Sequence, residues 1–291
     1  MEFTEPKVQS ALIAAAVSIL TLLLRAVTNP IWERNFHKFK LESNYKYDQR
    51  KRVREAISKH KVPLLNSAES LNHRLWNFSK NAPKAWHIQK DGEDISEKYY
   101  LLSFCYRFLL FFSICRKIDL ELIYLDSTVS TKKDLDFLKC LKLFPQIFSD
   151  TEIFKGTDYN HSVATDHFFS DEFRELVRVM SDDDDKTLSY SEFKKKVKEK
   201  EFTNLISYFS GISANHSCLR WQLLNSFHFI LMAFLNDYGY DFQKTSKVKI
   251  LELAQSLPPN RLIKNACILI ERVCLNNNKE VRKAISAFPK D

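Results

Sequence analysis

The chain has 291 residues, of which 45% are hydrophobic and 27% charged, and its formal net charge is +8. This length predicts one or two domains, and the hydrophobic content excludes a wholly disordered chain. Only four glycines are present, at positions 92, 156, 211 and 239. Glycine-rich dinucleotide loops, Walker-type phosphate loops and nucleophile elbows all need clustered glycines, so the sequence excludes these three classes of site.

The amino-terminal segment predicts a membrane anchor over residues 1–30. Residues 8–24 are seventeen consecutive uncharged residues, about 25 Å of helix, slightly less than a hydrocarbon core of about 30 Å. Arg25 can extend its guanidinium to the headgroups and so lengthen the span. We expect Asn29-Pro30 to end this helix, because proline lacks an amide hydrogen, and Trp32 to lie at the interface.

Two other interpretations of this segment are a cleaved signal peptide and a buried core helix. A signal peptide needs a basic start, whereas Glu2 and Glu5 outnumber Lys7, and residues 25–28 form a poor cleavage site. The anchor therefore remains the preferred interpretation. Ser10, Ala14 and Ser18 lie four residues apart, a spacing that favours close helix packing in lipid and suggests a homo-oligomer.

A basic segment follows, and residues 31–62 read as a juxtamembrane helix or stalk. From Arg25 to Lys61 there are eleven basic and four acidic residues, a net charge of +7. The positive-inside rule then places the amino terminus outside and the body in the cytoplasm, at the inner or plasma membrane. Either these charges contact anionic lipid or they only set the topology. The candidate membrane-surface residues are Arg25, Trp32, Arg34, Lys38, Lys40, Arg50, Lys51, Arg52 and Arg54. Because the rest of the chain is close to neutral, no nucleic-acid partner is expected.

Residues 63–291 predict an all-α domain. Pro63 is expected to open a helix, and residues 96–125 form an apolar helix buried on nearly all sides, with a second membrane span as the alternative. Further helices are expected at 132–144, 171–180, 191–208, 214–236, 247–255, 261–275 and 279–288, and a loop at 148–170. The six cysteines lack metal-binding spacing, which is typical of reduced, buried thiols.

Arg107 lies at the centre of the apolar run and is the candidate buried structural charge. A charge in such a helix needs a carboxylate or carbonyl partner, because an unpaired buried charge is strongly destabilising. The candidate carboxylates are Asp119, Asp126 and Asp136.

Short motifs in this region resemble those of a broad set of bacterial proteins. The motifs are Tyr106-Arg107 followed after four residues by Phe112, the pair Arg116-Lys117 and the ending Leu125-Asp126. The resemblance implies an amino-terminal membrane anchor and a helical cytoplasmic body, without an assigned activity. In those proteins a basic, glycine-containing segment follows the central loop, whereas residues 166–171 of this chain lack it.

Two segments carry candidate chemistry. Asp158, His161, Asp166 and His167 lie in the polar loop and could serve as acid–base groups of a membrane-tethered hydrolase, although their spacing matches no zinc pattern. The alternative is a polar loop that happens to contain two histidines.

Residues 181–192 resemble a calcium-binding loop in the placement of their oxygen ligands. Asp183, Asp185 and Glu192 would be its acidic ligands, with Lys186 where the turn needs glycine. The alternative is an acidic loop before a helix that Ser189 caps and pairs with Glu192.

The sequence therefore leads us to expect a membrane-anchored binding or effector module. Its partner would be a protein at the inner membrane face, and a bacterial defence or stress role is suggested by analogy. The first alternative is a membrane-tethered hydrolase that uses the His/Asp loop, and the second is an EF-hand-like calcium-responsive protein. No cofactor is expected, except calcium under the last of these.

Overall fold

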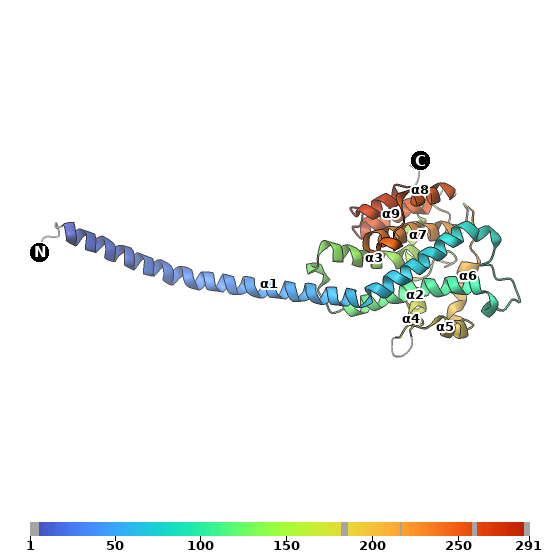
Figure 1. The fold of residues 1–291 in the computed structure, drawn as a ribbon, viewed down its shortest axis with the longest axis horizontal. Helices are drawn as coiled ribbons and strands as arrows, with labels where there is room; N and C mark the ends of the chain where they lie inside the picture. Colours follow the sequence, from blue (N-terminus) through green and yellow to red (C-terminus); the bar gives the residue numbers. More distant parts are fainter. Residues whose placement is uncertain (1–5, 182–185, 216, 258–260, 288–291) are drawn as a thin grey trace. The chain divides into compact units, whose positions relative to one another are not determined.

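The computed structural model describes residues 6–181, 186–215, 217–257 and 261–287, and this part of the chain is helical. It contains no strand, only an isolated bridge between Ser181 and Thr187. The expected all-α class is thus confirmed for the described residues (Figure 1). By its contacts the chain divides into two units, Met1–Arg52 and Val53–Asp291.

The first helix, α1, runs without a break over Pro6–Asn81 and belongs to both units. The prediction that it ends at Asn29-Pro30 is wrong, and so is the prediction that Pro63 opens a new helix. A proline inside a helix removes one amide donor and costs about 3 kcal/mol, and the bonds of the turns on either side can outweigh that cost in so long a helix. Within the second unit, α1 buries an apolar face against the rest of the fold, with Leu64, Leu65, Ala68, Leu71, Leu75 and Phe78 on it.

Two helices that are apolar on nearly all sides form the centre of the second unit, α2 (Tyr99–Leu122) and α7 (Leu219–Tyr238). Both are buried over most of their length, as the uninterrupted apolar sequence of each predicts. The expected 96–125 and 214–236 helices are therefore present with shorter or shifted ends. A second membrane span at residues 99–115 is not needed to account for α2, because protein surrounds it.

Aromatic rings fill the space between these helices and α3 (Lys132–Ser149). The ring centre of Phe227 on α7 lies 5.1–6.4 Å from those of Phe108, Phe112, Phe144 and Phe148. Aromatic pairs at such distances are stabilised by about 0.5–1.5 kcal/mol beyond the area they bury. The high phenylalanine content of the sequence is thus concentrated in one core.

The remaining helices surround this centre, and α7 contacts α9 and α10 while α2 contacts α4, α5 and α6 (Figure 1). Three cysteines are buried, and all six are free thiols. The bounds are α4 (Ser170–Arg178), α5 (Tyr190–Lys196), α6 (Thr203–Ser210), α8 (Lys247–Ser256), α9 (Arg261–Arg272) and α10 (Lys279–Ile285).

The expected helix at 191–208 is wrong, because the chain breaks between α5 and α6. Phe193 and Phe202 are both fully buried and meet edge to face at 5.2 Å. Phe193 and Phe202 are nine residues apart. In one straight helix, which turns about 100° per residue, their side chains would lie on opposite sides. The break, with a 3₁₀ turn at Lys200–Phe202, turns both rings into the same core.

Candidate functional site

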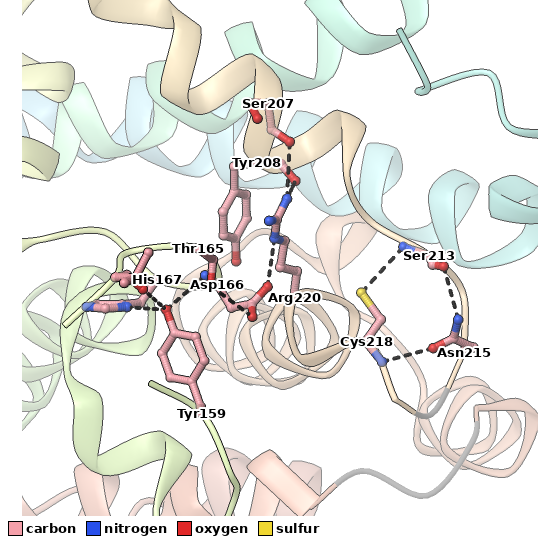
Figure 2. A network of polar contacts seen from close by, with 11 residues as sticks. Tyr159, Thr165, Asp166, His167, Ser207, Tyr208, Ser213, Asn215, Cys218 and Arg220 are labelled. Atoms are coloured by element: carbon pink, nitrogen blue, oxygen red, sulfur yellow. Dashed lines mark hydrogen bonds and ion pairs between the residues drawn. The ribbon is translucent and has the colours of Figure 1, made fainter. Parts of the chain in front are cut away.

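The polar loop after α3 folds around Tyr159, a residue that the sequence did not single out (Figure 2). Its hydroxyl accepts a hydrogen bond from the Asp166 amide at 2.9 Å and lies 2.6 Å from His167 Nδ1 and 3.1 Å from the Val163 carbonyl. Its ring packs on Phe154 at 4.4 Å. Tyr159 therefore connects the beginning of the loop to its end at Asp166 and His167.

Asp166 connects this loop to α6 and α7 through Arg220. The Arg220 Nε donates to Asp166 Oδ1 at 2.7 Å, and its Nη1 donates to the carbonyls of Ser207 and Tyr208, both at 3.1 Å (Figure 2). The side chains are 19% and 24% exposed, so the pair is mostly shielded from water. The carboxylate of Asp166 is thus neutralised and bound to the fold. The sequence did contain a signal that could have identified Arg220. This charge immediately precedes the uncharged run at 221–236, much as Arg107 lies within the apolar run at 99–115.

His167 is buried, and its environment opposes a charge on the imidazole. Burial lowers its pKa, His161 lowers it further, and Asp166 acts in the opposite direction. The Tyr159 hydroxyl occupies its Nδ1. His167 is therefore a neutral ring held by a tyrosine, which is not the carboxylate-oriented base of a nucleophilic triad.

The four hydrolase candidates do not form one cluster. Asp166, His167 and His161 gather around Tyr159, with the His161 ring 5.4 Å from the tyrosine ring. Asp158 lines a groove with Tyr159, Gln222 and Arg261, and the structure gives it no contact with Asp166, His161 or His167. Within the described ranges, no group of three or more His, Cys, Asp or Glu side chains is placed to hold a metal ion.

Next to Arg220, a second polar group fixes the start of α7. The Asn215 side-chain oxygen accepts hydrogen bonds from the amides of Ser217 and Cys218, and the Ser213 amide donates to Cys218 Sγ at 3.4 Å (Figure 2). These contacts satisfy backbone donors in the turn that precedes α7, two residues before Arg220.

Of the three acidic calcium candidates, Asp183 and Asp185 lie outside the described residues. Glu192 is in α5, where its carboxylate accepts bonds from the Ser189 amide and hydroxyl at 2.7 and 2.6 Å. Ser189 in turn accepts from the Glu192 amide, which completes a capping box. The capping alternative is therefore confirmed at Ser189, and calcium binding stays a prediction.

Arg107 is half-buried and finds a carbonyl rather than a carboxylate. Its Nη1 donates to the Ser70 carbonyl of α1 at 3.0 Å. Burial and the nearby Arg74 lower its pKa. The three aspartates that we expected as partners contact other groups: Asp136 lies 3.5 Å from Lys139, Asp126 accepts from Thr128, and Asp119 lines a groove.

The candidate membrane residues all lie on α1. Among the described residues, this is the one helix long and apolar enough to cross a membrane, and its most apolar window of eighteen residues is not buried at all. Ser10, Ala14 and Ser18 are exposed on it, and Trp32 stacks on Phe36 at 5.2 Å. Arg25, Arg34, Lys38, Lys40, Arg50, Lys51 and Arg52 are exposed too, whereas Arg54 pairs with Asp134 of α3 at 3.3 Å.

Comparison of the chain with protein-family models, with curated proteins and with solved structures finds no match. The function proposed below therefore depends on the residues and the geometry described above.

Proposed function

We propose that this protein is a membrane-anchored binding module, held by one transmembrane helix, whose helical body recognises a protein partner at the cytoplasmic face. The observation that carries the proposal is the uncovered apolar window of α1. Eighteen helical residues span about 27 Å, close to the thickness of a hydrocarbon core. A soluble protein rarely exposes so large an apolar surface, and lipid is the environment that would cover it.

The charges beyond this window support the orientation. The basic residues between Arg25 and Lys61 flank one side of the apolar window, and such flanks are retained in the cytoplasm. The amino terminus would then face outward, and the second unit would lie inside the cell. Most of these charges are exposed on α1, where anionic lipid can reach them.

The contacts of Asp166 and His167 in the polar loop favour a binding role over hydrolysis. The Asp166 carboxylate is paired with Arg220, which connects the loop to α6 and α7, and His167 is bound to Tyr159 within the loop. A hydrolase would need at least one of them oriented toward a substrate. If the protein is a binder, Asp166→Ala and His167→Ala in separate variants should retain the partner that co-purifies in mild detergent. An enzyme would instead lose its activity in these variants.

Cysteine labelling tests the topology. Cys274 is exposed, whereas burial raises the pKa of the Cys105 and Cys115 thiols and keeps them unreactive. A membrane-impermeant maleimide should label the full chain in spheroplasts only after permeabilisation, and Cys274→Ser should abolish most of the signal. A cysteine introduced by Thr4→Cys should be labelled without permeabilisation. Labelling of Cys274 in intact spheroplasts would contradict the orientation.

A further inference from the structure

A groove of about 500 Å³ lies between α2, α3 and α4, away from the Tyr159 loop. Each helix contributes one stripe at helical spacing. Phe112 and Asp119 come from α2, with Ile123 just past its end; Lys142 and Gln146 come from α3; and Phe173 and Arg174 come from α4. This volume falls within the range of about 300–1,000 Å³ that small-molecule sites occupy.

The floor of the groove is apolar, and part of its apolar wall is uncovered. Phe112, Phe173 and Val177 are buried beneath it. Leu120 and Ile123 at its edge are 40% and 61% exposed, which leaves apolar surface without a protein neighbour to cover it. A hydrocarbon chain laid along this floor would remove that surface from water.

The rim carries more positive than negative charge. Arg116, Lys142 and Arg174 line the groove with one carboxylate, Asp119. Arg174 also pairs with Asp171 at 3.2 Å, but both side chains are more than three-quarters exposed, and such a pair is weak. Burial raises the pKa of Asp119 to about 6 despite the neighbouring Lys142, so the negative charge of this lining carboxylate weakens below neutral pH. The rim therefore favours an anion.

The groove also contains acceptors that need a donor. Gln146 Oε1 is buried without a hydrogen-bond partner in the described structure. Pro145, inside α3, has no amide hydrogen to donate to the Leu141 carbonyl one turn earlier. A buried acceptor without a donor is destabilising, so a ligand hydroxyl that donates to Gln146 would be favourable.

We propose that this groove binds a single-chain anionic phospholipid, with the acyl chain on the apolar floor, the phosphate at the Lys142 and Arg174 side, and the free glycerol hydroxyl at Gln146. A free fatty acid would satisfy the floor and the cations but not Gln146. A diacyl lipid has a second chain, which a groove of about 500 Å³ would leave outside. This site adds to the proposed function and does not depend on the orientation of the anchor.

Photo-crosslinking of the full chain tests the proposal. The chain is placed in phosphatidylcholine nanodiscs, and the probe is lysophosphatidic acid with a diazirine in its acyl chain. We expect crosslinks on the groove stripes of α2, α3 and α4, in addition to those on α1 that any lipid chain in the disc produces. The double variant Lys142→Gln, Arg174→Gln removes the two cations at the phosphate and should lower the groove crosslinks about tenfold. Both residues are exposed, so their loss should not unfold the protein. The matched control, Lys194→Gln with Lys195→Gln on α5, changes the charge equally at another exposed surface and should leave the crosslinks unchanged.

Competition identifies the ligand. Unlabelled lysophosphatidic acid should displace the probe from the groove better than oleate, and diacyl phosphatidic acid should not displace it. Gln146→Leu should reduce competition by lysophosphatidic acid to the level seen with its deoxy analogue. Crosslinks confined to α1, or groove crosslinks that Lys142→Gln with Arg174→Gln leaves unchanged, would overturn the proposal. Equal competition by oleate would overturn the assignment of the phospholipid.

Discussion

Replacement of Arg220 by methionine tests whether the polar loop is held to α6 and α7 as described. The variant retains a stem of similar length but loses the bond to Asp166 and the two carbonyl bonds. Removing one partner of a buried ion pair costs about 3–5 kcal/mol. Because both side chains are about one-fifth exposed, water can partly replace the lost contacts, and we expect about 2–4 kcal/mol of lost stability.

Urea unfolding of the full chain in mild detergent measures this loss. Trp221 follows Arg220 directly and is 3% exposed, so its fluorescence reports the opening of this region. Adding Asp166→Asn to Arg220→Met removes the unpaired carboxylate and should recover about 1–2 kcal/mol. The control is Arg174→Met, which breaks the exposed pair with Asp171 and should cost less than about 0.5 kcal/mol. If Arg220→Met and Arg174→Met have the same small effect, the loop does not depend on Arg220 and our reasoning is refuted.

Three other predictions concern separate parts of the chain. Burial lowers the pKa of His228 to about 3, below its ordinary value near 6.5. As the pH falls, the unfolded chain therefore binds a proton at this residue at a higher pH than the folded chain does. Stability should therefore be full above pH 6.5 and fall by about 2–3 kcal/mol by pH 4.5 through this residue, a loss that unfolding curves of His228→Gln should not show. Ser189→Ala removes the capping box with Glu192 and should lower the free energy of unfolding by about 1 kcal/mol, measured by urea titration. Ala14→Leu and Ser18→Leu should weaken a crosslinked dimer in membranes, and a protein that crosslinks only as a monomer would argue against the homo-oligomer.

The sequence was most informative where one physical effect dominates. Residues 219–236 carry one charge, at Arg220, and such a helix is buried because no face of it can remain in water. Residues 8–24 are uncharged with no polar face, and α1 leaves them uncovered. In both cases composition alone predicts a helix. The first helix is buried and the second exposed because a core of other helices surrounds only the first.

The predictions failed where distant residues decide the local structure. Pro30 and Pro63 read as helix boundaries because a local rule treats each proline alone, whereas the long helix on both sides continues through them. The break before Thr203 follows from the need to bury Phe193 and Phe202 together, which no local pattern shows.

The candidate site was only partly predictable for the same reason. Asp166 and His167 were found by residue type, but their partners Tyr159 and Arg220 lie 7 and 54 residues from Asp166 along the chain. The chemical meaning of a carboxylate or an imidazole depends on what contacts it. The groove between α2, α3 and α4 was not predicted at all, since its stripes come from three helices that only the fold brings together.

The most direct test of the central claim is whether lipid surrounds the apolar window of α1. Membranes from cells that express the full chain should be washed with alkaline carbonate and centrifuged, and the pellet should then be extracted with detergent. We predict that the protein stays in the carbonate-washed pellet and is released only by detergent, because the proposed anchor would embed about 27 Å of apolar helix in the bilayer. Release by carbonate, or recovery of the full chain in the first supernatant, would contradict the anchor and with it the proposed function.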